Sequence, residues 1–233
     1  VGLTFKAFNG FSLDVSYYDT RTFNQTFDSQ LSVSSGYTAL YVQTGNVRNR
    51  GVELSLGYEH QWGIFGWNSN YTFSTNHNEV LELMENYTHP ETGNVISLDQ
   101  LKVGGFANAA FVLTPGGTLG DLYTTVDLNR DEFGNVYVDK DGNISRNAEI
   151  GYRKLGSVFS KANMAWNNDF NVGNLNFGFL ISARLGGIVY SATQARLDNF
   201  GVSEASALAR DNGGVMVDGY SIDPYKWYSV VGA

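Results

Sequence analysis

The sequence lacks cysteine altogether and has only 3 prolines, and charged residues make up just 16% of it. Without cysteine there can be no disulfide framework, thiol catalysis or cysteine-ligated zinc site. A transmembrane helix needs about 18 consecutive uncharged apolar residues, and no stretch of the sequence approaches this length. A helical membrane protein is therefore not expected. Basic residues are also scarce: 15 stand against 23 acidic ones, a net charge of −8. This balance argues against a nucleic-acid-binding protein, which needs a basic surface for phosphates.

Aromatic residues, in contrast, are abundant at 14%, and there are 27 glycines. So many aromatic and branched residues exclude a disordered chain, and the glycines follow no collagen period. The chain begins with Val1, without an initiator methionine, inside a strand-like pattern. We therefore expect it to be a piece of a longer protein, with any signal segment lying upstream.

Six segments alternate between apolar and polar residues with the period of two that a β-strand imposes. The second, for example, places Leu13 and Val15 on one face and Asp14 and Ser16 on the other. An Asn9-Gly10 pair, a strong hairpin signal, separates the first two segments. The six segments cover about residues 3–8, 11–17, 52–59, 67–76, 161–170 and 175–185.

The connections between these segments alternate in length. Tight turns join the first to the second, the third to the fourth and the fifth to the sixth. Long loops are expected near residues 25–45, 85–160 and 192–233. A transmembrane β-barrel explains this pattern, because its strands are apolar toward lipid and polar toward the lumen, with short periplasmic turns and long extracellular loops.

Aromatic residues gather beside the tight turns, as the aromatic girdle at a membrane interface predicts. They are Phe8, Phe11, Trp62, Phe65, Trp67 and Phe170. Six strands cannot close a membrane barrel, since the smallest bacterial ones have about eight. An open edge in lipid would leave backbone groups unpaired. We therefore expect the sheet to be completed by strands outside this chain.

Several segments resemble SusC/RagA-type TonB-dependent transporters. The stretch from Asn46 to Leu56 resembles the family's "N-x-G-V-E-L" strand, and Leu13 to Asp19 resembles the strand before it. The stretch from Phe73 to Leu83 resembles the segment "N-x-N-x-V-x-x-L". Tyr190 to Thr193 and Ala195 to Asp198 also fit the family. The resemblance covers nearly the whole chain, in order.

This resemblance implies an all-β fold: residues 1–233 would form a C-terminal portion of a 22-stranded transmembrane barrel in the outer membrane of a Gram-negative cell. The whole protein would import oligosaccharides or peptides with a SusD-type surface lipoprotein, driven by TonB through a plug domain that lies outside this chain. It would be neither an enzyme nor dependent on a cofactor. Its long loops would be extracellular.

Two other functions remain open at this stage. A passive outer-membrane porin would share the fold without the energy coupling. A secreted, glycan-binding β-sandwich would be soluble and would need no further strands. Tyrosine- and asparagine-rich loops suit sugars as well as peptides, so the sequence does not name the substrate.

Polar residues of the alternating segments should face the lumen and are the candidates for contact with substrate or plug. They are Asp14, Glu53, Asn68, Asn70, Asn163, Asn167 and Arg184.

Asp139, Asp141 and Asn143 are weak candidates for a metal site, because oxygen ligands at alternate positions are typical of calcium loops. The EF-hand pattern fails here, since Ile144 and Ile150 stand where it requires glycine and glutamate. Ordinary hairpin turns explain these residues better. The three histidines show no metal-binding spacing, and no motif for a nucleophile or a phosphate loop occurs.

Overall fold

The computed structural model describes residues 1–7, 10–30, 39–88, 93, 95–106 and 109–231. The chain divides into two compact units. The first comprises Val1–Val103, Val112–Asp121 and Ser157–Ile188, and the second comprises Gly104–Phe111, Leu122–Gly156 and Val189–Ala233.

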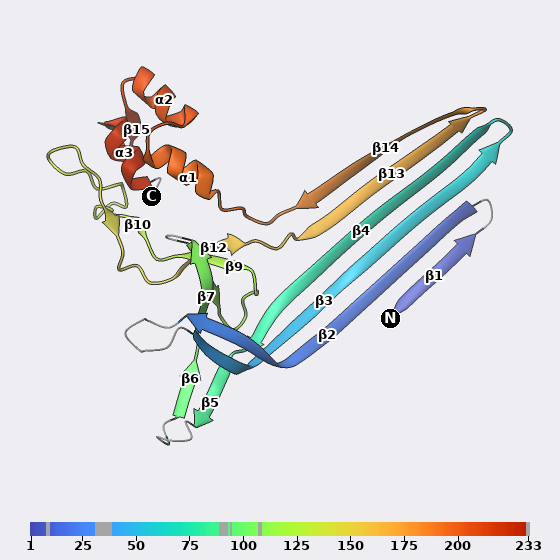
Figure 1. The fold of residues 1–233 in the computed structure, drawn as a ribbon, viewed down its shortest axis with the longest axis horizontal. Coiled ribbons are helices and arrows are strands. Elements are labelled where there is room, and N and C mark those ends of the chain that lie inside the picture. The colour runs from blue at the N-terminus through green and yellow to red at the C-terminus, as the bar shows by residue number, and fades with distance from the viewer. Residues whose placement is uncertain (8–9, 31–38, 89–92, 94, 107–108, 232–233) are drawn as a thin grey trace. The chain divides into compact units, whose positions relative to one another are not determined.

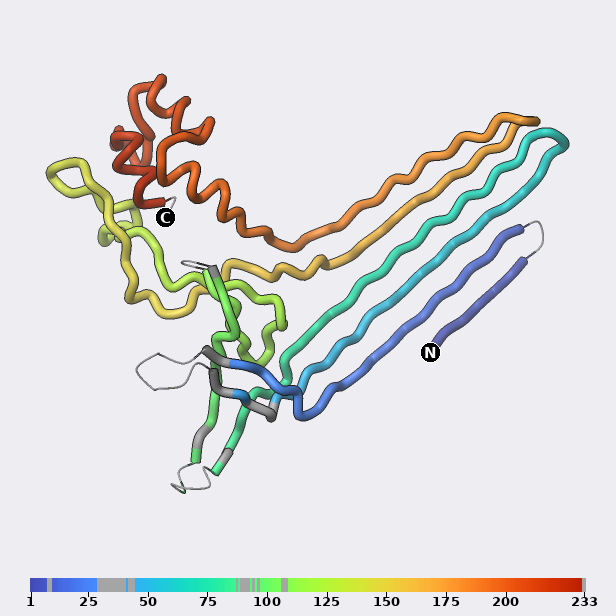
Figure 2. Tube along the Cα trace, in the orientation of Figure 1, coloured from blue at the N-terminus to red at the C-terminus, as the bar shows by residue number. Residues whose placement is uncertain are grey.

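A six-stranded antiparallel sheet with the strand order β1-β2-β3-β4-β13-β14 dominates the first unit (Figure 1). Its strands are β1 (Gly2–Ala7), β2 (Phe11–Gln30), β3 (Ala39–Trp62), β4 (Phe65–Glu82), β13 (Ala162–Val172) and β14 (Leu175–Leu185). The tube in Figure 2 shows β4 and β13 side by side, although residues 83–161 separate them in the chain. All six alternating segments are therefore confirmed as strands of one sheet, joined in the predicted order.

The strand register sorts side chains onto two faces. Val15 pairs with Leu54, Leu54 with Phe73, and Phe73 with Met164. Because side chains alternate along a strand, these apolar residues share one face and their polar neighbours share the other. On β14, Leu175, Phe177 and Ile181 of the apolar face are all more than half exposed to solvent. No second sheet covers this face in the described part of the chain.

Aromatic rings cover the end of the apolar face that lies next to the tight turns. The ring centroids of His60 and Trp62 are 4.4 Å apart, and those of Phe170 and Phe177 are 5.0 Å apart. Trp67 stacks parallel to Phe170 at 6.2 Å. The predicted cluster of aromatics is thus continuous across β3, β4, β13 and β14, while Phe8 and Asn9 lie outside the described residues.

Two polar residues, Ser69 and Asn168, sit opposite each other on the apolar face. The indole Nε1–H of Trp67 donates to Asn168 Oδ1 at 3.0 Å, and that of Trp166 donates to Ser69 Oγ at 2.9 Å. Asn168 is fully buried. In an apolar medium an indole N–H without an acceptor is costly, so the two polar residues satisfy the tryptophans beside them.

The loop expected at residues 25–45 is wrong in its bounds, because β2 extends to Gln30 and β3 begins at Ala39. The register shifts between Thr22 and Gln25 and again after Gln25, and Asn24 has a positive φ of 53°. Such a β-bulge inserts an extra residue and reverses the alternation beyond it. The alternation of apolar and polar residues is therefore interrupted near Asn24, although strand β2 itself continues to Gln30.

Part of the long insertion packs against β4 in the first unit. Val80 N–H donates to Gly117 C=O, Gly116 N–H donates to Val80 C=O, and Leu119 N–H donates to Asn78 Oδ1, each at 2.8 Å. Val80 is fully buried beside Leu83, Leu101 and Leu113. This unit also holds the hairpin of β5 (Met84–Thr88) and β6 (Val95–Leu98).

The second unit is built from short elements around a small core. Val136, Ile144 and Ile222 are buried there, and Trp227 and Val230 pack against them. A four-stranded sheet of order β12-β9-β8-β7 lies mostly in this unit. Its strands are β7 (Leu101–Phe106), β8 (Ala109–Leu113), β9 (Asp121–Thr124) and β12 (Arg153–Ser157). Two small hairpins pair β10 (Asp127–Leu128) with β11 (Arg146–Asn147) and β15 (Val215–Val217) with β16 (Tyr220–Ile222).

Three helices occupy residues 192–233, where the sequence predicts a loop: α1 (Ala192–Asn199), α2 (Glu204–Asp211) and α3 (Pro224–Val231). Ser191 and Ser203 cap the first two, since their hydroxyls accept from Gln194 N–H and Ser206 N–H. Eight-residue helices span about two turns, too few for a clear period of 3.6. None of the described helices is long and apolar enough to cross a membrane.

The two faces of β14 should respond differently to charge. Phe179 lies on the apolar face with its ring edge-on to Trp166 at 5.7 Å, whereas Ser182 lies on the polar face. Phe179→Arg should destabilise the folded barrel by about 2–4 kcal/mol, because it places a charge in hydrocarbon. The unfolding free energy of the full-length protein in a bilayer measures this. Ser182→Arg is the matched control, and equal losses from the two variants would contradict the assignment of the faces.

Candidate functional site

The polar face of the six-stranded sheet carries a groove of about 600 Å³. Two rows of register partners cross it. One row runs Ser16, Glu53, Ser74, Asn163 and Arg184, and the other runs Asp14, Ser55, Thr72, Ala165 and Ser182. The groove is therefore lined by hydroxyl, amide, carboxylate and guanidinium groups from β2, β3, β4, β13 and β14.

Four of the seven predicted lumen-facing residues line this groove: Asp14, Glu53, Asn163 and Arg184. Asp14 and Glu53 lie on neighbouring strands one row apart, and Arg184 lies on β14, with its guanidinium donating to Val158 C=O at 3.1 Å. Within the described residues neither carboxylate forms an ion pair. The groove thus presents two acidic side chains at one side and one basic side chain at the other.

The other three predicted residues lie closer to the tight turns. Asn70 and Asn167 are register partners, and Asn167 Nδ2 donates to Asp169 Oδ2 at 2.6 Å. Asn68 and Asp169 are also register partners and line a second groove of about 700 Å³ with Glu59. The register therefore brings all seven predicted residues to one face. The register also places Asp169 on this face, and the alternation along β13 could have identified it from the sequence.

The polar face presents hydroxyl, amide, carboxylate and guanidinium groups. Its groups can donate and accept hydrogen bonds, and they match the hydroxyls and amides of sugars and peptides equally well. No group of three or more histidine, aspartate or glutamate side chains suited to a metal ion occurs in the described part of the chain.

The weak metal candidates lie instead in a turn of the second unit. Asp139 Oδ1 accepts from Asp141 N–H at 2.9 Å and from Asn143 N–H at 2.8 Å, and Asp139 Oδ2 accepts from Asn143 Nδ2 at 3.1 Å. These donors already occupy the carboxylate oxygens that a calcium ion would need. The arrangement corresponds to the turn that the sequence favours over a calcium loop.

The same turn occurs eight residues earlier. Asp131 Oδ1 accepts from Phe133 N–H and from Asn135 N–H, both at 2.9 Å. Both copies read Asp-x-x-Gly-Asn, with Gly134 and Gly142 at positive φ. Each is followed by a buried residue, Val136 or Ile144, of the second unit's core. The repeat thus forms two hairpin turns that deliver apolar residues to one core.

Hydrogen bonds lower the pKa of both turn aspartates. In Asp139 the Asn143 backbone and side-chain donors exert the main effect. Burial alone would raise the pKa of Asp131, but the donors of Asn135 and Phe133 outweigh it and lower that pKa as well.

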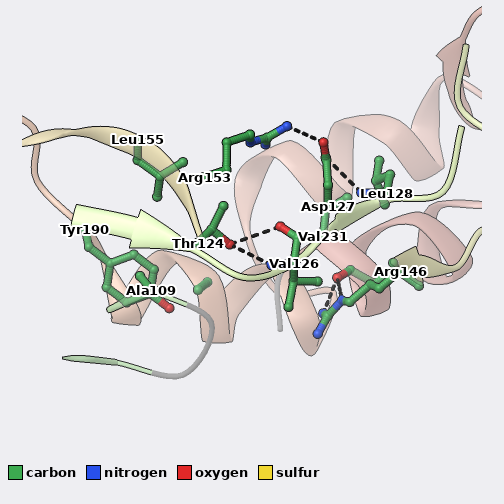
Figure 3. Close-up of a pocket in the computed structure, with 12 residues that line it drawn as sticks. Ala109, Thr124, Val126, Asp127, Leu128, Arg146, Arg153, Leu155, Tyr190 and Val231 are labelled. Carbon is green, nitrogen blue, oxygen red and sulfur yellow. Dashed lines mark hydrogen bonds and ion pairs between the residues drawn. The ribbon is translucent and has the colours of Figure 1, made fainter. Parts of the chain in front are cut away.

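A smaller cavity of about 290 Å³ lies within the second unit (Figure 3). Apolar side chains such as Leu155 and Val231 line it together with the ion pair of Asp127 and Arg153. Burial acts to raise the pKa of Asp127, but Leu128 N–H and the Arg153 guanidinium bring the pKa below its ordinary value. The Arg146 guanidinium donates to Val230 C=O. The Arg153 and Arg146 guanidinium groups thus already have acceptors, and these contacts stabilise the fold of the second unit.

Comparison with known proteins gives concordant matches. A family described as "TonB dependent receptor-like, beta-barrel" matches residues 1–179. The curated TonB-dependent receptor P39 of Formosa agariphila is 23% identical over a 214-residue alignment that covers 77% of this chain and 20% of that protein. The solved RagAB peptide transporter matches with a TM-score of 0.61 at 19% identity, covering 88% of this chain and 22% of that chain. The chain spans about a fifth of the length of these relatives.

The turn at Asp139 should stabilise the second unit in a pH-dependent way. In the folded protein the Asp139 carboxyl has a pKa below its ordinary value of 3.8. Its contribution to stability is therefore complete above pH 3.8 and is lost as the pH falls through the lower folded-state pKa. Asp139→Asn should open residues 137–145 more readily at neutral pH, and the difference from the native protein should shrink below about pH 4. Hydrogen exchange of the full-length protein, corrected for its intrinsic pH dependence, measures this.

Asp141→Asn is the matched control, because the Asp141 side chain makes no hydrogen bond among the described contacts. If both variants opened the segment equally, or if the difference persisted at acidic pH, the charged turn would not be the cause.

Proposed function

Because the chain belongs to the family of TonB-dependent receptor-like β-barrels, we propose that it forms part of the wall of an outer-membrane importer driven through TonB. The SusC/RagA-type resemblance and the all-β barrel fold expected from the sequence are confirmed. The plug, the site that contacts TonB and the remaining strands of a 22-stranded barrel would lie in other parts of the full-length protein.

The observation that carries this proposal is the six-stranded sheet with one apolar and one polar face. Its apolar face is exposed, its aromatic rings lie beside the tight turns, and its polar face is grooved. The described sheet ends at β1 and β14, and both edges need partner strands in a membrane, where unpaired backbone groups are costly.

In this arrangement the grooved polar face lines the lumen. The seven residues Asp14, Glu53, Asn68, Asn70, Asn163, Asn167 and Arg184 would contact the plug or the passing substrate. We propose an oligosaccharide or a peptide as that substrate, and the solved RagAB relative is titled a peptide transporter. Mixed hydroxyl, amide and charged groups support either class.

The second unit would lie on the extracellular side, together with the other long connections, because strict up-and-down topology places these connections opposite the tight turns. It exposes large apolar side chains, among them Phe133 at 81%, Phe200 at 73% and Tyr225 at 73%. Exposed apolar groups of this kind support contact with a partner, and we propose a SusD-type surface lipoprotein in that role.

The alternative of a secreted β-sandwich is wrong, since the chain belongs to a barrel family and no second sheet packs on the apolar face of the described sheet. A passive porin remains the second candidate, because it would present the same wall. Energy coupling distinguishes the two.

Uptake by the full-length protein should depend on TonB. In cells that express it, uptake of labelled oligopeptides or oligosaccharides should fall to background when TonB is deleted or the proton gradient is dissipated, because the plug then stays closed. The amount of protein in the outer membrane serves as the control. Undiminished uptake without TonB would support the porin instead.

Removing the two Asp-x-x-Gly-Asn turns should impair partner binding and uptake without preventing barrel assembly. Leu128 and Arg146 are antiparallel partners, so a short glycine-serine turn can replace residues 129–145 between them. None of these residues pairs in the six-stranded sheet. Lipoprotein capture in a pull-down should drop about tenfold or more.

The point variant Phe133→Ser, at an exposed turn position, separates lost contacts from a disturbed fold and should weaken capture in the same direction. Loss of membrane assembly with intact partner capture would contradict the assignment of this segment to the extracellular side.

A further inference from the structure

The outward face of the sheet becomes basic where its apolar band ends. The last row of the band contains the register partners Tyr17, Val52 and Thr75. The next two rows on the same face pair Asp19 with Arg50 and His77, and Arg21 with Arg48 and Glu79. These six residues are termed the outer basic patch below.

The position of this patch along the strands matches the depth of lipid head groups. From Trp62 at the tight turn to Val52 there are about ten residue steps of about 3.3 Å each along β3, or about 33 Å. A strand tilt of about 40° reduces this to about 25 Å of height, the usual height of the apolar band of an outer-membrane barrel. The two charged rows follow within the next four residues, so they lie at the level of the head groups.

The orientation of the patch is fixed independently by the opposite face of the same strands. Asn78 and Val80 of β4 alternate with His77 and Glu79, and both of their side chains are buried. Asn78 Oδ1 accepts from the backbone N–H of Leu119, and the Val80 side chain packs in one cluster with Leu101 and Leu113. Protein therefore covers the inner side of this part of the wall. The outer basic patch points the other way, toward the surroundings of the barrel.

Positive charge exceeds negative charge in the patch, with three guanidinium groups against two carboxylates. Arg48 forms a two-pronged ion pair with Asp19, through Nε to Oδ1 at 2.9 Å and through a second guanidinium nitrogen to Oδ2. Arg21 and Arg50 are exposed and form no ion pair with any described residue. Two cations are thus available at the membrane surface in a chain whose net charge is −8.

We propose that the outer basic patch binds the phosphate of an anionic lipid head group in the outer leaflet, with Arg21 and Arg50 as its ligands. A guanidinium can bind a phosphate through two parallel hydrogen bonds, and each arginine near an anionic membrane surface favours binding. Arg48 is already engaged in its ion pair with Asp19, which leaves Arg21 and Arg50 as the ligands. This inference rests on the proposed placement of the sheet in the outer membrane.

The test uses the full-length protein in phosphatidylcholine discs and in detergent, with lipid A and its dephosphorylated form as probes. Native mass spectrometry of retained lipid should show a preference for the phosphorylated form. The double variant Arg21→Gln/Arg50→Gln should bind the phosphorylated form about thirtyfold more weakly and lose the preference. Lys6→Gln/Lys161→Gln is the matched control, because it removes two positive charges outside the patch and should keep the preference. Lys6 lies on the polar side of β1, and Lys161 directly precedes β13.

The proposal would be overturned by a preference that survives in the arginine variant or by equal loss in both double variants. Binding of inorganic phosphate as tight as that of lipid A would also overturn it, because it would indicate a site for free anions. Insertion into discs without any phosphate preference would overturn the lipid site alone. Failure to insert at all would overturn the proposed function along with it.

Discussion

The pairing of backbone groups in a medium without water is the constraint on which the rest of this structure depends. In lipid, each N–H and C=O must find its partner within the protein, and antiparallel strands in strict register achieve this. The register then fixes every side chain, because one residue of slip would move the apolar set to the lumen. The insertion at residues 83–161 leaves this order intact, since β13 pairs with β4 on the far side of it.

The same constraint explains the departures from simple alternation. Ser69 and Asn168 are polar residues on the apolar face, and each accepts from the indole N–H of a neighbouring tryptophan. Tryptophans suit the membrane interface through their large rings, but their N–H groups need acceptors. A second departure is Leu180, which pairs with Asn167 on the polar face and is 64% exposed. Nothing in the described residues accounts for it.

The candidate site differs from the fold in how much could be anticipated. Alternation within each strand was enough to place three polar residues on one face, once all the polar faces were assigned to the lumen. These residues are Asp14, Glu53 and Arg184. That these three line one groove depends on the register between five strands, which places Glu53 and Arg184 in one row and Asp14 in the next. The outer basic patch was missed for a related reason. Asp19 and Arg48 lie beyond the ends of the apolar runs, where alternation no longer marks a face.

The sequence by itself determined the six strands, their two faces and their tight turns, because a period of two over many residues is a local property that each strand carries alone. The family followed separately, from segments such as Asn46 to Leu56 that resemble its members. Only the tertiary structure decided where β2 ends and β3 begins, since the bulge near Asn24 reverses the pattern, and that three short helices follow β14. It also decided that the Asp-x-x-Gly-Asn turns bring Val136 and Ile144 to Ile222. Those features depend on contacts between residues far apart in the chain, which no local pattern records.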